Sequence, residues 1–364
     1  MRIVIKVGTS TLTTKEGLLN EQYIFNLAKE VFSLREQGHK ILIVSSGAVS
    51  AGKTHLCIKD KHKTLREKQA FAAVGQPLLM SAYSKAFAEY NNSVSQILLT
   101  RDVFDRRANY INVRNTLNTL IENDIIPIIN ENDSVSIDEI NFGDNDMLSA
   151  LVALAINAEK LIIFTDVDGV YNGTPKASSL IPKIDHITEE IEKLTSSTSS
   201  SGRGTGGMKT KIIAAKIATA SGVETIITNG TKLNLLKEIV LGSFIGTTIL
   251  ASKKHLEAKK SWIAFSKKPK GTIFVDQKAE DFLLNKGKSL LAVGITKISG
   301  AFKRGDTINI ANAQTKKDFA RGLTNYDSDI LEKVKGKKSQ EIKNIVDAGE
   351  GEIIHRDNLV IISN

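Results

Sequence analysis

The chain has 364 residues, of which 41% are hydrophobic and 24% are charged, and its formal net charge is +9. A single hydrophobic core rarely serves more than about 250–300 residues, so this length predicts two domains. No run approaches the roughly 18 consecutive apolar residues of a membrane-spanning helix. The single cysteine, Cys57, excludes an intramolecular disulfide and a cysteine-based zinc site.

The first predicted element is the apolar run Arg2–Val7, which is typical of a strand. It lacks the long apolar stretch and small-residue cleavage site of a secretory signal, so we expect a cytoplasmic protein. The excess of positive charge is spread along the chain rather than gathered in one arm. Charge alone therefore does not indicate a nucleic-acid partner.

Strand-like runs alternate with amphipathic stretches over the first two thirds of the chain. Their nearly continuous Ile, Leu and Val content is typical of strands buried on both faces of a parallel sheet. Between the first two runs, apolar residues at three- and four-residue spacing predict a helix that Asn20 caps and Gly38 ends. We expect an α/β fold, a three-layer α/β/α sandwich with ligands at the carboxyl ends of its strands. The predicted strands are Arg2–Val7, Lys40–Ser45, Ser95–Leu99, Ile125–Ile129, Lys160–Thr165 and Glu224–Thr228.

The composition changes near residues 267–271, which indicates a domain boundary. Beyond it, short apolar runs separated by glycines predict a small β-barrel with one or two helices. We expect a first domain at 1–255, a linker at 256–269 and a second domain at 270–364. The short runs are Gly271–Val275, Leu290–Ile295, Thr307–Ile310 and Leu359–Ile362.

Lys6 lies one residue before the end of the first predicted strand, and Gly8 follows it. In that position its ammonium group would lie beside backbone N–H groups that can bind an anion. It could then neutralise a phosphoryl group during transfer. The alternative is a surface lysine on an edge strand.

Gly47–Thr54 matches the P-loop pattern G-x-x-x-x-G-K-T and follows a predicted strand. A P-loop nucleotidase would place Lys53 on the phosphates and Thr54 on magnesium. Two features of the sequence argue against a P-loop at this position. The run follows the second strand rather than the first, and a polar, lysine-rich stretch at 59–68 interrupts the helix after it.

A stretch of only Ser and Thr at 195–201 leads into Gly202, Gly204 and Gly207, ahead of a helical run. This glycine spacing matches the dinucleotide fingerprint, but no strand precedes it, which disfavours a Rossmann dehydrogenase. Glycines still allow close approach to phosphates, and a helix N-terminus with Lys211 one turn in favours an anion. A flexible linker is the alternative.

Polar residues gather after two further strands. Asn130–Asp133 follow the fourth strand, and Gly143–Asp146 open an apolar helix. Either Asp144 or Asn145 could be only the helix cap. The remaining amides and carboxylates suit recognition of a zwitterion, since they accept from an ammonium group and donate to a carboxylate. Thr165–Asp166 ends another strand and could contact a nucleotide or begin a turn.

Taken together, these segments resemble the amino acid kinase family, and the resemblance covers essentially the whole chain. It implies an ATP-dependent kinase that uses Mg²⁺ and phosphorylates the side-chain carboxylate of glutamate, the first step of proline biosynthesis. A carboxylate is already ionised near neutral pH, so this reaction needs no general base. The segments that carry the resemblance are Val4–Ser10, Val44–Ala48, Ile129–Asp133, Gly143–Asp146, Thr165–Asp166 and Gly204–Lys211.

The resemblance also implies roles for single residues. Lys6 and Lys211 would neutralise the transferred phosphoryl group, and Asp146 would hold both lysines in place. Magnesium would be held through the ATP phosphates, with no dedicated protein ligand. The residues implied to bind glutamate are Ser46, Gly47, Asn130, Asp133 and Asn145. Lys53 would then take no part in the reaction. The residues implied to bind ATP are Lys6, Gly8, Thr165, Asp166, Thr205, Gly206, Gly207, Met208, Lys209, Thr210 and Lys211.

The C-terminal part resembles a PUA domain, a small β-barrel also found in RNA-modifying enzymes. We leave RNA binding open, because in this kinase family the module is not thought to be required for the reaction. One departure is Thr174, where many relatives carry an acidic residue before the proline; this bears on the adenine and magnesium contacts. The segments that carry this resemblance are Gly271–Asp276, Ser289–Gly294, Gly305–Asp306, Arg321–Tyr326 and Val360–Ser363.

The family resemblance implies proline as a feedback inhibitor and a homo-oligomer, either a dimer or a tetramer, without a membrane partner. Two alternatives to a glutamate kinase stay open. One is a kinase for another small anion, such as acetylglutamate, aspartate or a nucleoside monophosphate. The other is an RNA-binding protein on an inactive kinase scaffold, against which the presence of Lys6, Lys211 and Asp146 argues.

Overall fold

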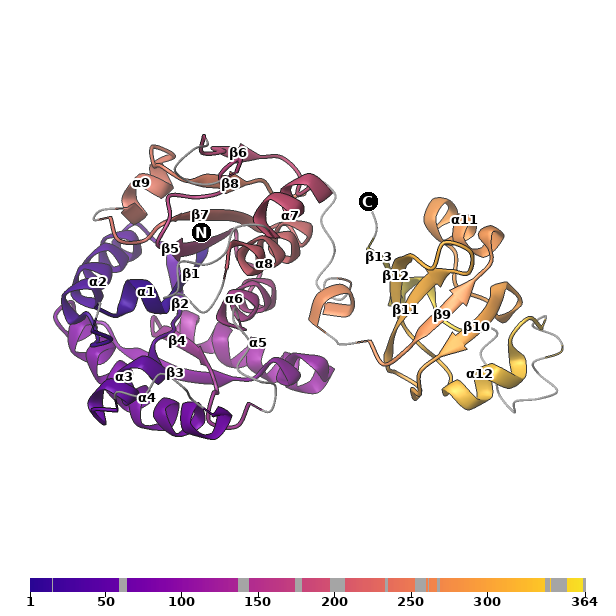
Figure 1. The fold of residues 1–364 in the computed structure, drawn as a ribbon, viewed down its shortest axis with the longest axis horizontal. Helices are drawn as coiled ribbons and strands as arrows, with labels where there is room; N and C mark the ends of the chain where they lie inside the picture. Colours follow the sequence, from indigo (N-terminus) through magenta and orange to yellow (C-terminus); the bar gives the residue numbers. More distant parts are fainter. Residues whose placement is uncertain are drawn as a thin grey trace. The chain divides into compact units, whose positions relative to one another are not determined.

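In the computed structural model the chain forms two compact units, Met1–His255 and Leu256–Asn364 (Figure 1). Each unit has its own buried apolar cluster, as expected for a chain too long for one core. None of the described helices is both long and apolar enough to cross a membrane. The structure describes residues 1–14, 16–58, 64–136, 144–173, 179–196, 207–232, 235–252, 260, 262–266, 269–337, 341 and 352–362.

The first unit is built on one large sheet. Within the described residues its strands are β1 (Arg2–Val7), β2 (Lys40–Val44), β3 (Val94–Leu99), β4 (Ile126–Glu131), β5 (Lys160–Thr165), β6 (Lys183–Ile184), β7 (Glu224–Asn229) and β8 (Thr247–Ile249). They lie in the order β3-β4-β2-β1-β5-β7-β8-β6, and all neighbouring pairs are parallel except β7 with β8. β1 therefore lies inside the sheet, hydrogen-bonded on both sides.

Helices cover both faces of this sheet (Figure 1). The helical segments described in the first unit are α1 (Thr9–Leu12), α2 (Glu21–Glu36), α3 (Ala48–His55), α4 (Leu65–Ala88), η1 (Arg101–Asp105), α5 (Arg107–Glu122), α6 (Asp144–Ala155), α7 (Glu189–Ser196), α8 (Met208–Ala220) and α9 (Leu235–Leu241). Apolar side chains of α2, α4 and α9 form the large core with one face of the sheet. On the other face α6 packs against β1 and β5 and beside α8.

The α/β architecture predicted for the first unit is confirmed. All six predicted strands are present, each to within two residues at either end. The predicted helix after β1 is α2, where the Asn20 side chain accepts a hydrogen bond from the Tyr23 N–H at 3.1 Å. Gly38, with φ +82°, follows its end. Two short strands near the sheet edge, β6 and β8, were not predicted, because two or three residues carry too little periodicity.

The second unit contains a smaller mixed sheet, where the sequence predicted a small β-barrel of the PUA type. Its described strands are β9 (Thr272–Val275), β10 (Ile295–Ser299), β11 (Thr307–Asn312), β12 (Asp318–Leu323) and β13 (Leu359–Ile361). They lie in the order β10-β9-β11-β12-β13, with β9 and β11 parallel and the other pairs antiparallel. The helical segments described here are η2 (Trp262–Ser266), α11 (Gln277–Lys286), η3 (Ala292–Gly294), α12 (Ser328–Val334) and η4 (Arg356–Asn358).

One predicted strand of the second unit is wrong. The run Leu290–Ile295 forms a single bridge at Leu290 and then the short η3 helix, and β10 begins only at Ile295. Leu290 and Ala292 are buried while Leu291 and Val293 are exposed, so the sequence alternates as a strand would although the backbone turns. At Gly294 a β-carbon would lie 2.5 Å from the Ala279 side chain, which explains the glycine by the close approach of α11.

Candidate active site

Lys6 lies in the central strand β1 and points away from the large apolar core. Side chains alternate between the faces of a strand, so Ile5 and Val7 enter that core while Lys6 faces the side covered by α6 and α8. Only 6% of Lys6 is exposed. The alternative interpretation of Lys6 as a surface lysine on an edge strand is therefore wrong.

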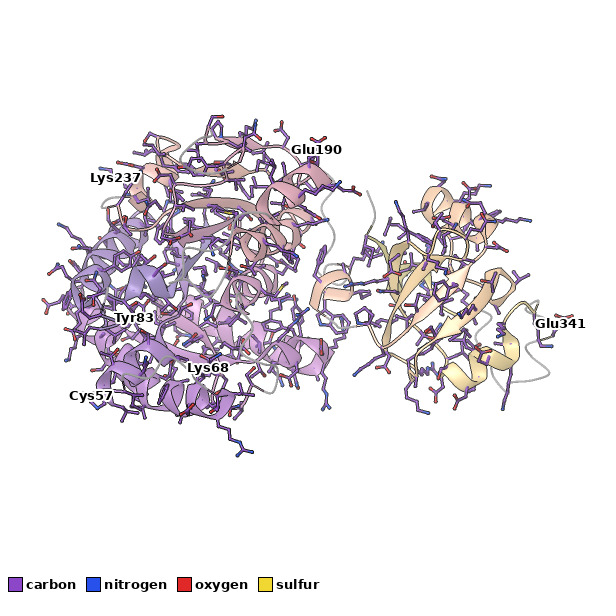
Figure 2. All side chains as sticks on the ribbon, in the orientation of Figure 1. Cys57, Lys68, Tyr83, Glu190, Lys237 and Glu341 are labelled. Carbon is purple, nitrogen blue, oxygen red and sulfur yellow. The ribbon has the colours of Figure 1, made fainter. Side chains whose placement is uncertain are left out.

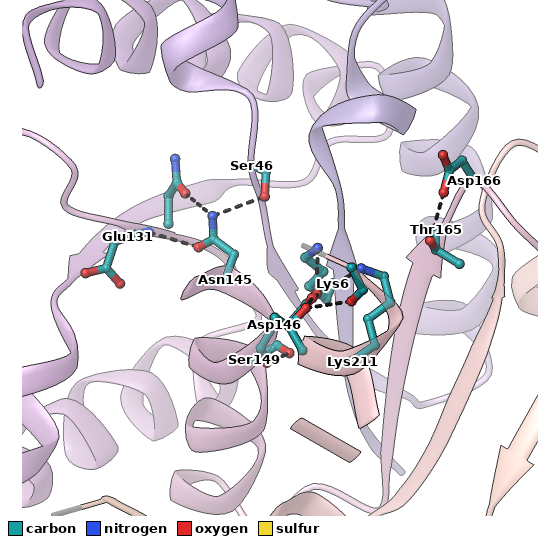
Figure 3. Close-up of polar contacts among 12 residues, drawn as sticks. Lys6, Ser46, Glu131, Asn145, Asp146, Ser149, Thr165, Asp166 and Lys211 are labelled. Atoms are coloured by element: carbon teal, nitrogen blue, oxygen red, sulfur yellow. Dashed lines mark hydrogen bonds and ion pairs between the residues drawn. The ribbon is translucent and has the colours of Figure 1, made fainter. Parts of the chain in front are cut away.

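Asp146, in the first turn of α6, joins two lysines from distant parts of the chain (Figure 3). Its Oδ1 lies 2.7 Å from Nζ of Lys6, and its Oδ2 lies 3.2 Å from Nζ of Lys211 on α8. The hydroxyl of Thr210 donates to the same Oδ2 at 2.7 Å. Asp146 is fully buried and Lys211 is 5% exposed. We refer to Lys6, Asp146 and Lys211 as the lysine cluster.

Burial and charge act in opposite directions on the lysine cluster. Burial alone would raise the pKa of Asp146, but the ammonium groups of Lys6 and Lys211 outweigh it and hold this pKa at about 2. Burial lowers the pKa of Lys6, and the attraction of Asp146 offsets part of that effect. Asp146 is therefore ionised at neutral pH. With both lysines protonated, the cluster has one net positive charge.

Asn145 on α6 gathers a second set of polar groups, visible beside the lysine cluster in Figure 3. Its Nδ2 donates to Oγ of Ser46 and to Oδ1 of Asn130, both at 3.1 Å, and its Oδ1 accepts from the backbone N–H of Glu131 at 3.1 Å. We refer to Ser46, Asn130 and Asn145 as the amide cluster. The interpretation of Asn145 as a helix cap is wrong, since α6 already begins at Asp144.

The loop after β2 holds Ser46 beside α6. Gly47 has φ +99°, in the left-handed region that favours glycine, and α3 starts directly after it. The hydroxyls of Ser45 and Tyr83 lie 3.0 Å apart and form a buried hydrogen bond that ties this loop to α4. Asp133 lies two residues beyond the end of β4 and is half-buried.

The described residues among those predicted to contact ATP lie at the ends of β1 and β5 and at the start of α8. Thr165, the last residue of β5, is 6% exposed, and its hydroxyl donates to Oδ1 of Asp166 at 3.2 Å. At Gly8 a β-carbon would lie 3.5 Å from Nζ of Lys6, so a larger residue would approach the ammonium group. Among the described residues, no group of three or more His, Cys, Asp or Glu side chains is arranged to hold a metal ion.

The start of α8 carries the described part of the predicted ATP loop. A β-carbon on Gly207 would meet no atom of the described residues within 4 Å. Met208 begins the helix, Lys209 is exposed, and Thr210 and Lys211 turn inward to Asp146. The predicted contacts Thr205 and Gly206, and the position of Thr174, lie outside the described residues.

Comparison with known protein families finds two matches. Residues 1–229 match the amino acid kinase family, and residues 271–346 match the PUA domain. The first match contains both the lysine cluster and the amide cluster. The chain belongs to the amino acid kinase family.

Bacterial glutamate 5-kinases are among the relatives of this kinase. The one from Thermoanaerobacter sp. (strain X514) is 45% identical over 366 residues, which cover 100% of this chain and 98% of that relative. The one from Dictyoglomus thermophilum is 45% identical over 369 residues, with the same coverage of the two chains. The similarity runs through both units, and the family expectation is confirmed together with its PUA part.

A solved structure supports the same fold. The carbamate kinase from Giardia lamblia, solved bound to AMP-PNP, superimposes with a TM-score of 0.50 at 18% sequence identity. The match covers 69% of this chain and 98% of that enzyme. At this level of identity the likeness concerns the fold alone, and it agrees with the three-layer arrangement of the first unit.

The P-loop match at Gly47–Thr54 is explained by helix packing in this kinase. The middle of the run is helical, because α3 starts directly after the first glycine. A β-carbon on Gly52 would lie 1.9 Å from the carbonyl oxygen of Phe71, so this glycine allows α3 and α4 to touch. The hydroxyl of Thr54 donates to the Gly17 carbonyl at 3.0 Å. The P-loop interpretation is therefore wrong.

Three polar residues of α4 contact the loops after β2 and β4 or strand β4 itself, and they were not predicted from the sequence. Gln69 donates to the Ser136 carbonyl at 3.0 Å, and Gln76 accepts from Nδ2 of Asn130 at 2.9 Å. Tyr83, labelled in Figure 2, lies fully buried inside the first unit. The signal for them is their seven-residue spacing, which places large polar side chains on one face of a helix.

Proposed function

We propose that this chain transfers the γ-phosphoryl group of ATP to the side-chain carboxylate of L-glutamate, producing L-glutamyl 5-phosphate and ADP. The observation that carries this proposal is the lysine cluster, in which one buried carboxylate holds two ammonium groups from β1 and α8. The amide cluster adjoins it through consecutive residues of α6. Similarity to glutamate 5-kinases along the whole chain supports glutamate as the acceptor.

In the proposed reaction an oxygen of the glutamate γ-carboxylate attacks the γ-phosphorus of ATP in line. A bond forms between these two atoms, the bond from the γ-phosphorus to the β,γ-bridging oxygen breaks, and ADP keeps the electron pair. The attacking carboxylate is already ionised near neutral pH, so no general base takes part. Magnesium brought in with the ATP phosphates would neutralise part of their charge.

The lysine cluster supplies the rest of the neutralisation. Lys6 and Lys211 stabilise negative charge on the transferred group, and Asp146 holds them at fixed positions before the substrates arrive. Such preorganised charges need little rearrangement during the reaction, which is why they stabilise the transition state. Thr210 links Asp146 to the N-terminus of α8, where the ATP loop ends.

The remaining predicted residues divide between the two substrates. On the acceptor side Ser46, Gly47, Asn130, Asp133 and Asn145 bind the glutamate backbone groups and its side chain. On the nucleotide side the contacts are Gly8, Thr165, Asp166 and the loop from Thr205 to Lys211. The described residues among them lie at the carboxyl ends of β1, β2, β4 and β5 and in the first turns of α6 and α8, which supports this division.

The test is ADP release from Mg-ATP with and without L-glutamate, with the acyl phosphate trapped as a hydroxamate. Aspartate, acetylglutamate, carbamate and a nucleoside monophosphate serve as alternative acceptors. We expect product only with glutamate, and less of it when proline is added. Product with another acceptor but none with glutamate would contradict the proposal.

A second candidate function, RNA binding, is favoured by a surface hollow in the second unit. The hollow has a volume of about 410 Å³ and is lined by apolar side chains together with Lys260, Lys288, Arg356 and Asp357. Lys288 lies within the residues that match the PUA domain, and cations that line a concave surface suit a phosphate backbone. We expect salt-dependent binding of structured RNA by the full chain. The same affinity after Lys288→Glu and Arg356→Glu would exclude this hollow as the site.

A further inference from the structure

The amide cluster belongs to a longer chain of side-chain amides that ends on α4. Asn145 donates to Asn130, Asn130 donates to Oε1 of Gln76 at 2.9 Å, and Gln76 donates to Oε1 of Gln96 at 3.1 Å. Asn130 is 1% and Gln76 is 8% exposed, whereas Gln96 on the edge strand β3 is exposed. This series of hydrogen-bonded amides therefore runs from the acceptor site through the protein interior to the surface.

The direction of every hydrogen bond in this series of amides follows from one backbone group. The oxygen and nitrogen of a side-chain amide are hard to tell apart by shape alone, so their orientation must come from partners. The backbone N–H of Glu131 can only donate, which requires the oxygen of Asn145 to face it. The nitrogen of Asn145 then faces Ser46 and Asn130, and the nitrogen of Asn130 must face Gln76.

This order determines what the acceptor site offers to a substrate. Ser46 accepts from Asn145, so its own hydroxyl is able to donate to a carboxylate. The arrangement requires Asn130 to present its oxygen to Asn145, and Asn130 does so because Gln76 accepts from its nitrogen. Without that acceptor Asn130 would keep a buried N–H group without a partner, or rotate and turn its nitrogen toward that of Asn145.

We propose that Gln76 is a positioning residue for the glutamate side of the reaction, acting through Asn130 and Asn145 without touching the substrate. This inference rests on the proposed function. Helix α4 supports it with two further contacts at seven-residue spacing from Gln76. Gln69 holds the loop after β4 through the Ser136 carbonyl, and Tyr83 holds the loop after β2. Gln76 thus lies midway along a helix face that anchors the loops after β2 and β4.

The test compares Gln76→Met with Gln96→Met in the full chain, with Gln76→Glu as the conservative variant. Methionine keeps the volume and removes the hydrogen bonds, while glutamate keeps an oxygen that accepts from Asn130. We expect Gln76→Met to raise the KM for glutamate about tenfold, the scale of one unsatisfied buried donor. The KM for ATP and kcat should change by less than about threefold, because the lysine cluster is untouched. Gln76→Glu should restore most of the glutamate KM.

Gln96→Met is the matched control, because it removes the last hydrogen bond of the same series of amides, at its exposed end. The KM values of this variant should stay within about twofold of those of the parent. Equal glutamate KM values for Gln76→Met and Gln96→Met would overturn the inference, as would parallel changes in both KM values and kcat. If Gln76→Met does not fold, Gln76→Asn, which is one methylene too short to reach Asn130, should show the same selective rise. A parent chain without glutamate-dependent ADP release would instead contradict the proposed function.

Discussion

The two halves of the candidate site are organised by consecutive residues of α6 but use different physical means. Asp146 holds Lys6 and Lys211 by charge, in a cluster that is almost fully buried. Asn145 holds Ser46 and Asn130 by neutral hydrogen bonds whose direction is set by a backbone N–H group. The charged half suits a phosphoryl group, and the neutral half suits an amino acid that must bind and leave.

This difference implies that substitutions in the two halves change different kinetic parameters. Removal of a charge from the lysine cluster takes away stabilisation that matters most in the transition state. Removal of a hydrogen bond from the amide cluster mainly weakens the binding of one substrate. Measurements that separate kcat from the two KM values can therefore test whether the halves are independent.

The largest effect is expected from Lys211→Ala. It should lower kcat by about two to three powers of ten, the usual scale for one preorganised transition-state stabiliser, with little change in the KM for glutamate. The matched control is Lys216→Ala on the same helix, where the lysine is about half exposed and pairs with Glu192. An unchanged kcat for Lys211→Ala, measured as ADP release at saturating substrates, would refute the role of the lysine cluster.

The next effect is a pH-dependent stability. The pKa of Asp146 is lowered from 3.8 to about 2 in the folded protein. Its contribution to the free energy of unfolding is therefore present above about pH 4 and is lost as the pH falls toward 2. The contribution is about 2 kcal/mol, since one pKa unit corresponds to about 1.4 kcal/mol. The difference in Tm between the parent and Asp146→Asn should narrow over this range. A difference that stays constant from pH 7 to pH 2 would contradict this assignment.

A smaller and more selective effect is expected from Asn145→Ala, which removes three hydrogen bonds on the acceptor side. The KM for glutamate should rise about tenfold or more, while the KM for ATP changes by less than about threefold. Each KM is measured by varying one substrate while the other is saturating. Asn285→Ala, at an exposed position of α11, is the control. A fall in kcat as large as that of Lys211→Ala would show that the two halves are not separable.

The smallest effect is expected from Lys53→Ala. In a P-loop this lysine would contact the phosphates, and its loss would reduce activity severely. In this structure it lies within α3, whose neighbouring Gly52 serves the contact with α4. We expect kcat and the KM for ATP to stay within about twofold of the parent. A hundredfold loss of ADP release would restore the P-loop interpretation.

The sequence by itself predicted the six longer strands of the first unit and the kinase family, and it singled out Lys6 and Lys211 as candidates. These features are local: a strand buried on both faces appears in the sequence as one apolar run, and each lysine is marked by the glycines beside it. The same local reasoning failed at Leu290–Ile295, because alternating burial belongs to a turn as well as to a strand.

The tertiary structure alone shows the contacts between these groups, including the pairing of Lys6 and Lys211 with Asp146 that the family resemblance implied. Lys6 and Lys211 meet at Asp146 because parallel strands place β1 beside β5, and α6 and α8 pack side by side on that face. Gln76 acquires its partner from β4, far away in the chain. An amide has no direction of its own, and a buried charge has no fixed pKa, until the fold brings their neighbours within a few ångströms.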